Sequence, residues 1–360
     1  MKLDITCNQL TDFLFAKADA KGIPFAGSFE LTPRCTLNCK MCYIHKSSFD
    51  KTAIAEEKDT AFWLDLAKDA RDAGMLMLLL TGGEPMLRSD FDEIYRECKK
   101  LGLLVSVNTN ATLIDEDKLR LFSEYPPHKL SVTLYGASPE TYGSLCGNPS
   151  AYQRVVDSIQ ELKKAGVNLK INYSITPDNV ADIPAVTAFI KELGVPAIAA
   201  SYMFGSVRNC GEAYRLSAED AARAQLEWHR GMLGDEELAR RIASDVPPDS
   251  DGELCSRRIN CRAGLSTFWV TWQGEMTPCG MMSAPSVPVT DFNDAWLATR
   301  KARENIYLPA ECSGCKHKKK CDMCAAVSLG ETGRSDAVPP YACRKAHEYA
   351  QLCEDFVSRQ

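Results

Sequence analysis

The stretch Cys35-Thr36-Leu37-Asn38-Cys39-Lys40-Met41-Cys42-Tyr43 follows the apolar segment from Phe25 to Leu31 and carries three cysteines at C-x3-C-x2-C spacing. A structural zinc site and a fully ligated iron–sulfur cluster each need one cysteine or histidine more than this loop supplies. Three thiolates on a [4Fe–4S] cluster would leave one iron open to a ligand that takes part in chemistry. Three unrelated buried thiols, or zinc with a fourth ligand from elsewhere, are the alternatives.

The composition is that of a chain able to bury a large core. It has 360 residues, 45% of them apolar, and a net charge of −6, which gives no reason to expect nucleic-acid binding. Residues 1–30 show no secretory signal. The longest apolar run, Met75 to Leu80, is too short to span a membrane. We therefore predict a cytoplasmic protein with neither nucleic acid nor membrane as a partner.

The cysteine content indicates metal ligation. There are 16 cysteines in the chain, and disulfides are rare in a compartment that keeps thiols reduced. Only five histidines accompany them, which favours thiolate-bound iron–sulfur clusters over zinc.

Residues 26–202 alternate apolar runs with amphipathic stretches, as expected for repeated βα units around a parallel sheet. The six predicted strands are 27–31, 76–80, 103–107, 130–135, 169–175 and 197–202. The predicted helices lie within 3–20 and near 57–73, 90–101, 115–124, 150–165 and 182–193. In such folds the chemistry collects at the carboxyl ends of the strands.

Three of these strand ends carry residues suited to binding a ligand. Gly82-Gly83-Glu84 follows the second strand, and glycines allow backbone amide and carbonyl groups to approach a ligand. A plain glycine turn is the alternative. Asn110 follows the third strand, and Thr133 lies on the polar face of the fourth, where a hydroxyl directed into a barrel needs a partner.

The cysteine loop and the Gly82-Gly83-Glu84 loop together resemble the radical S-adenosylmethionine (AdoMet) superfamily. The resemblance implies an α/β fold built on a partial (β/α)6 barrel. It implies that Cys35, Cys39 and Cys42 hold a [4Fe–4S] cluster whose open iron binds the AdoMet amino and carboxylate groups. An electron from that cluster then splits AdoMet into methionine and a 5′-deoxyadenosyl radical. The residues that it assigns to AdoMet are Tyr43, Gly82, Gly83, Glu84, Asn110 and Thr133.

Two positions depart from the pattern of that superfamily. Ala111 stands where many relatives have a glycine after Thr-Asn. Tyr135 stands where relatives carry an acid, which removes one expected contact to AdoMet.

Cysteines become denser after residue 250. A zinc ribbon and a bacterial ferredoxin both have different spacings. The pattern is similar to the SPASM domain that is appended to many radical AdoMet enzymes, although its last internal spacing is one residue shorter than usual. Its eight cysteines are Cys255, Cys261, Cys279, Cys312, Cys315, Cys321, Cys324 and Cys343.

Sulfatase-maturing relatives imply how these cysteines divide between two auxiliary [4Fe–4S] clusters. The nearer cluster would be held by Cys255, Cys261, Cys279 and Cys324. The outer cluster would be held by Cys312, Cys315, Cys321 and Cys343. With Cys255 present, the nearer cluster has no open iron, so we expect it to carry electrons and not to bind substrate.

The domain organisation follows from these patterns. We predict an N-terminal helical extension over 1–24, the barrel over 25–202, a helical bridge and linker over 203–254, and the SPASM domain with a C-terminal helix over 255–360. Cys146 and Cys210 follow the fourth and sixth strands, which makes them candidates for a redox or proton-donating thiol.

The resemblance implies an oxidoreductase that abstracts hydrogen from its substrate and passes the resulting electron to the auxiliary clusters. A peptide- or protein-modifying maturase, forming a thioether or carbon–carbon cross-link or a dehydrogenated product, is the first hypothesis. A sugar or cyclitol dehydrogenase is the second, and a non-catalytic iron–sulfur electron carrier is the third. An enzyme of this class needs an electron donor of the flavodoxin or ferredoxin type.

Overall fold

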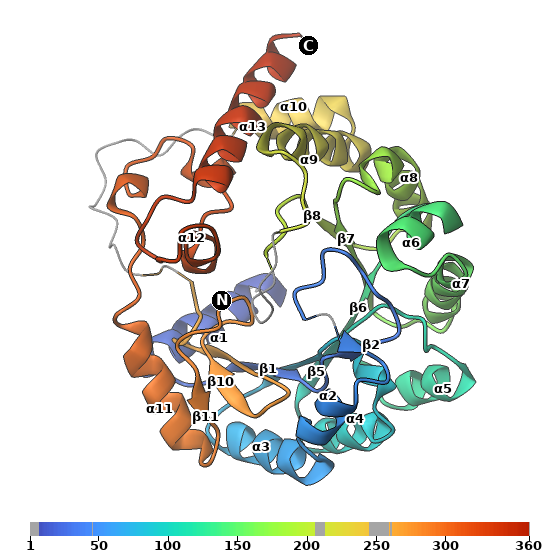
Figure 1. Ribbon diagram of the computed structural model, residues 1–360, viewed down its shortest axis with the longest axis vertical. Coiled ribbons are helices and arrows are strands. Elements are labelled where there is room, and N and C mark those ends of the chain that lie inside the picture. The colour runs from blue at the N-terminus through green and yellow to red at the C-terminus, as the bar shows by residue number, and fades with distance from the viewer. Residues whose placement is uncertain (1–6, 45, 206–212, 245–258, 260, 360) are drawn as a thin grey trace, which may run out of the picture.

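The computed structural model describes residues 7–44, 46–205, 213–244, 259 and 261–359. Its strands β1 and β4 to β8 alternate with helices around a partial barrel (Figure 1). The predicted α/β fold with a partial barrel is confirmed, and each predicted strand overlaps an observed one. Those strands are β1 (Ala26–Glu30), β4 (Met77–Thr81), β5 (Leu104–Thr109), β6 (Lys129–Thr133), β7 (Leu169–Ser174) and β8 (Ala197–Ala200).

The main sheet is larger than the predicted barrel. Three strands from the C-terminal part join it, in the order β11-β10-β9-β1-β4-β5-β6-β7-β8. β9 pairs in parallel with β1, and β10 and β11 continue in antiparallel order. The cysteine-rich part of the chain therefore begins as an extension of the barrel sheet. The added strands are β9 (Thr267–Val270), β10 (Glu275–Thr277) and β11 (Val287–Pro288).

The helices that cover the barrel were mostly predicted. They are α1 (Cys7–Lys21), α3 (Thr60–Asp72), α4 (Phe91–Lys100), α5 (Glu116–Glu124), α7 (Ala151–Lys164) and α8 (Ile183–Leu193). Two short helices were missed, namely α2 (Lys51–Glu56) and α6 (Pro139–Cys146). The helical bridge predicted within 203–254 contains two helices, α9 (Ala218–Leu233) and α10 (Asp235–Ser244), which are separated at Gly234, where φ is +80°.

Local sequence explains where these helices begin and which face they bury. Asp59 and Asp115 cap α3 and α5 by accepting a hydrogen bond from an amide three residues on. On α4 the buried residues Phe91, Ile94 and Cys98 recur at helical spacing. One face of each amphipathic helix therefore packs on the sheet.

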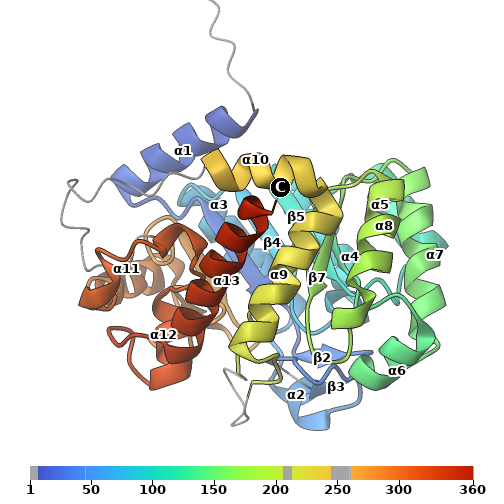
Figure 2. The same cartoon turned by 90° about the horizontal axis from the view of Figure 1, so that it is seen from above.

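The C-terminal part packs against the barrel near its last strand, at α9, and near its first strand, at Gly22. It contains α11 (Phe292–Arg303), α12 (Ala325–Thr332) and α13 (Pro340–Ser358). Figure 2 shows α13 lying alongside α9. On the opposite side, the indole of Trp296 on α11 donates to the carbonyl of Gly22 at 3.0 Å. None of the described helices is long and apolar enough to cross a membrane.

Candidate active site

The cysteine loop lies between two short strands, β2 (Arg34–Cys35) and β3 (Lys46–Ser47), which pair in parallel. It rests on the C-terminal end of α6. There the backbone amides of Asn38 and Lys40 donate to two helix carbonyls, each at 3.0 Å. The loop thereby satisfies carbonyl groups that a helix end leaves without a partner. A helix that was missed in the sequence thus supports the loop that defines the site.

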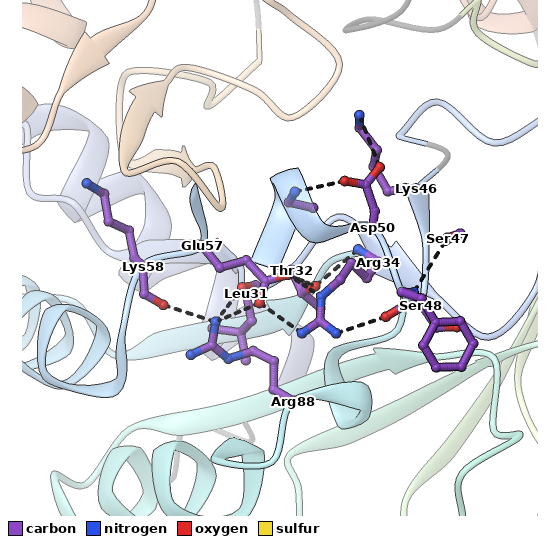
Figure 3. A network of polar contacts seen from close by, with 12 residues as sticks. Leu31, Thr32, Arg34, Lys46, Ser47, Ser48, Asp50, Glu57, Lys58 and Arg88 are labelled. Atoms are coloured by element: carbon purple, nitrogen blue, oxygen red, sulfur yellow. Dashed lines mark hydrogen bonds and ion pairs between the residues drawn. The ribbon is translucent and has the colours of Figure 1, made fainter. Parts of the chain in front are cut away.

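A buried ion-pair network holds the two ends of this loop together (Figure 3). The guanidinium of Arg34 binds both carboxylate oxygens of Glu57, at 2.6 and 3.0 Å, and donates to the carbonyl of Ser48 at 3.1 Å. Arg88 approaches the same carboxylate at 3.5 Å and donates to the carbonyl of Leu31 at 3.1 Å. Because Arg34 precedes Cys35 and Ser48 follows β3, the network fixes both entrances to the cysteine loop.

A cavity of about 330 Å³ opens beside the loop at the carboxyl ends of the strands. The three loop cysteines line it, and so do most of the residues that the sequence assigns to AdoMet. The predicted residues that it brings together are Cys35, Cys39, Cys42, Tyr43, Gly82, Gly83, Asn110 and Thr133. Residues from four separate segments of the chain therefore converge on a single space.

The two glycines of the second strand end pack directly on the chain that enters the cysteine loop. A Cβ atom at Gly82 would lie 2.3 Å from the carbonyl oxygen of Thr32, and one at Gly83 would lie 2.3 Å from that of Arg34. The amide of Gly83 donates to Thr32 at 2.7 Å. Glycine is required here because two backbone segments lie in contact, a reason that the sequence analysis did not anticipate.

Glu84 differs from the other predicted residues in where its side chain lies. The carboxylate is fully buried and accepts hydrogen bonds from the amides of Met86 and Asn110, at 3.2 and 2.8 Å, and from the hydroxyl of Thr109. Burial raises the pKa of Glu84 to about 7, against the effect of these hydrogen bonds. Since its side chain is directed at β5 and not into the cavity, we propose that Glu84 positions the end of β5.

Asn110 connects that strand end to the cysteines. Its side-chain amide donates to the thiol of Cys35 at 3.3 Å and to the hydroxyl of Thr36 at 3.1 Å. The next residue, Ala111, has a φ of 60°, a conformation that favours glycine. The turn expected after Thr-Asn is therefore formed here despite the alanine.

The surroundings of the loop cysteines disfavour free thiolates. Burial raises the pKa of Cys35 to about 12, and the nearby Glu84 acts in the same direction. The pKa of Cys39 is raised first by its contact with the thiol of Cys146 and then by burial. Thiolates at these positions need a cationic group to compensate their charge. Three thiols facing one cavity are a donor set that fits an iron–sulfur cluster.

Other candidates occupy different positions relative to the cavity. Tyr135, which replaces the acid of relatives, lines the cavity, and burial raises its pKa. Cys146 is buried at the end of α6 behind the cysteine loop, against Cys39. Cys210 lies outside the described residues. Sequence reasoning missed Met203, Phe204 and Met281, which also line the cavity, since apolar residues at loop positions carry no motif.

The C-terminal cysteines fall into two groups. One group surrounds a cavity of about 170 Å³, and its members are Cys312, Cys315, Cys321 and Cys343. The second group consists of Cys261, Cys279 and Cys324. Burial, and then the neighbouring thiols of Cys324 and Cys261, raise the pKa of Cys279. Cys255 lies outside the described residues. A single zinc ion would need its four thiolate sulfurs about 2.3 Å away. Four thiols around a cavity therefore fit a group that is larger than a single ion.

Comparison with known families and curated proteins places this site in context. Residues 29–190 match the family described as the Radical SAM superfamily. The chain is 26% identical to the AdoMet-dependent heme synthase of Methanosarcina barkeri over 87% of this chain and 95% of that protein. It is 25% identical to the PqqA peptide cyclase of Gluconobacter oxydans over 86% of this chain and 88% of that protein.

Solved structures resemble the fold over nearly its whole length. Streptococcus suis SuiB bound to the precursor peptide SuiA superposes with a TM-score of 0.68 at 17% identity, covering 94% of this chain and 82% of SuiB. The enzyme anSMEcpe with bound AdoMet and Cp18Cys peptide gives a TM-score of 0.67 at 16% identity, covering 93% of this chain and 98% of that one. At these identities the likeness concerns the fold.

Proposed function

We propose that this chain, whose residues 29–190 match the Radical SAM superfamily, abstracts hydrogen from a peptide or protein and passes the resulting electron to two auxiliary [4Fe–4S] clusters. The observation that carries the proposal is the convergence of Cys35, Cys39 and Cys42 with Gly82 and Gly83 on one cavity. A [4Fe–4S] cluster with AdoMet bound supplies a 5′-deoxyadenosyl radical, which is able to break an unactivated C–H bond.

The residues of the cavity have separate tasks in this proposal. The three cysteines hold the cluster, and Asn110 orients Cys35 through its hydrogen bond at 3.3 Å. The amide of Gly83 already donates to Thr32, so in this proposal the backbone carbonyls of Gly82 and Gly83 would accept from the amino group of AdoMet. The side chains of Tyr43 and Thr133 supply further polar groups at the same cavity.

The two C-terminal cysteine groups support the second half of the proposal. Cys321 and Cys324 are separated by only two residues, yet Cys321 lines the four-thiol cavity and Cys324 lies with Cys279. A short covalent segment therefore joins the two groups, which suits the transfer of an electron between two clusters. Cys255 would complete the second set of four.

A peptide substrate is favoured by the relatives. PqqA peptide cyclase is named for a peptide substrate, and SuiB and anSMEcpe have been crystallised with peptides. A second candidate is a reaction on a tetrapyrrole, since the heme synthase of Methanosarcina barkeri aligns with 95% of its own length. The relatives named above do not favour the small-molecule dehydrogenase or the electron-carrier hypothesis.

Anaerobic reconstitution tests this proposal. We expect about twelve irons per chain, and release of 5′-deoxyadenosine from AdoMet after reduction. About four irons should remain in a variant in which six C-terminal cysteines are replaced by alanine, namely Cys279, Cys312, Cys315, Cys321, Cys324 and Cys343. Replacing Cys35, Cys39 and Cys42 by alanine should abolish that release and leave about eight irons. An iron-loaded protein that releases no 5′-deoxyadenosine would be an electron carrier, and the proposal would be wrong.

A further inference from the structure

A second cavity, of about 730 Å³, adjoins the cysteine cavity. Tyr202, Phe204 and Met281 line both spaces. The walls of the larger cavity also come from residues just before α9, from α12 and from the first turn of α13. Figure 1 shows α13 lying beside α9, with α12 next to it. A molecule held in the larger cavity would lie directly beside the cavity that we assign to AdoMet.

Arg215 lines this cavity and stacks on two of its aromatic side chains. Its guanidinium lies over the ring of Tyr341 at 3.7 Å from the centroid and 5.3 Å from that of Tyr202. Its approach to the carboxylate of Glu331, at 3.7 Å, is longer than a hydrogen bond. A guanidinium stacked on an aromatic ring keeps its N–H donors directed outward from its edge.

Glu331 forms its closest hydrogen bonds with other groups, so its ion pair with Arg215 is a long one. Its two carboxylate oxygens accept from the hydroxyl of Tyr202 at 2.8 Å and from the amides of Tyr341 and Ala342 at 2.8 and 3.3 Å. Those amides belong to the first turn of α13, where backbone N–H groups have no partner within the helix. The carboxylate thus caps α13 and fixes both tyrosines beside Arg215.

The backbone around Arg215 is held on both sides. The hydroxyl of the preceding residue, Tyr214, donates to Asp178 at 2.5 Å, and Asp178 also binds Lys40 of the cysteine loop at 3.0 Å. The hydroxyl of Tyr341 donates to the carbonyl of the following residue, Leu216, at 3.0 Å. Arg215 is therefore a preorganised cation, with little conformational freedom left to lose when it binds a ligand.

We propose that Arg215 binds a carboxylate of the substrate, while Tyr202, Phe204 and Tyr341 contact the apolar part next to that carboxylate. This inference rests on the proposed function and specifies the chemistry of its substrate. A planar guanidinium recognises a carboxylate through two parallel hydrogen bonds. The carboxylate is that of an acidic residue in a peptide or of an acidic side chain on a tetrapyrrole.

Binding measurements on the reconstituted enzyme with AdoMet test this inference. The probes are two matched pairs, acetyl-Glu-Phe amide against acetyl-Gln-Phe amide, and protoporphyrin IX against its dimethyl ester. We expect the acid of one pair to bind about 10- to 100-fold more tightly than its neutral partner, the range for a hydrogen bond between charged groups. The pair that shows this preference identifies the source of the carboxylate.

Variants connect the preference to the residue. Arg215→Met should abolish it, Arg215→Lys should retain part of it, and Arg334→Met, at an exposed arginine after α12, should leave it intact. Equal binding of acid and neutral partner in both pairs by the unaltered enzyme would overturn the inference without any variant, as would a preference that survives in Arg215→Met. Release of 5′-deoxyadenosine, measured separately, shows whether the proposed function itself holds.

Discussion

Replacing Glu57 by glutamine removes the negative charge that Arg34 and Arg88 share below the cysteine loop. The side chains of Glu57 and Arg88 are 8% and 7% exposed, so water compensates little of the loss. Breaking a buried ion pair from one side costs about 3–5 kcal/mol. Here Arg34 keeps the carbonyl of Ser48, and Arg88 keeps Asp90 at 2.6 Å. We therefore expect Glu57→Gln to lower the free energy of unfolding by about 2–3 kcal/mol.

Urea denaturation of the metal-free protein, followed by circular dichroism, measures this loss. At an m-value of about 2–3 kcal/mol/M the midpoint should fall by about 1 M. Glu237 provides the matched control, because it too accepts from two arginines, Arg240 and Arg241, but on an exposed helix face. Glu237→Gln should leave the midpoint unchanged within error. Equal shifts in the two variants would refute the argument that burial makes the Glu57 network stabilising.

Three further predictions follow from the same region. Burial raises the pKa of Glu84 to about 7, above its value of about 4.3 in the unfolded chain, so the folded state binds the extra proton and stability falls as pH rises from about 4 to about 7. We expect the free energy of unfolding of the metal-free wild type, relative to that of Glu84→Gln, to be about 3 kcal/mol lower at pH 8 than at pH 5. A difference that stays constant between the two pH values would contradict the raised pKa. Gly83→Ala should destabilise the protein by about 2 kcal/mol or more, because its Cβ would lie 2.3 Å from the carbonyl oxygen of Arg34. Gly330→Ala, with open space around the Cβ, is the control and should be neutral or stabilising when both variants are compared by thermal melting. Ala111→Gly should lower the free energy of unfolding only slightly, since the left-handed φ of 60° favours glycine by about 1 kcal/mol. Ala67→Gly within α3 is the control and should lower it by about 1 kcal/mol. Equal losses of stability at both sites would show that the backbone at Ala111 is unstrained.

Much of the barrel was predictable because its signals are local. Alternating apolar runs and helical periodicity placed the six barrel strands to within a few residues. The same reasoning missed α2 and α6, whose short sequences carry little periodicity. It also treated Gly82 and Gly83 as free to meet a ligand, although their missing side chains face the backbone of Thr32 and Arg34. That contact joins segments about fifty residues apart, which no local pattern encodes.

The sequence by itself determined the chemistry of the ligands, because closely spaced cysteines such as Cys35, Cys39 and Cys42 are held near one another by the chain whatever the fold. It also determined the βα order, since periodicity and strand length are properties of short segments. Only the tertiary structure decided that β9 joins β1 and that Arg215 stacks on Tyr341 beside the cysteine cavity. Those pairings bring together residues more than a hundred positions apart, and they depend on how the whole chain buries its apolar faces.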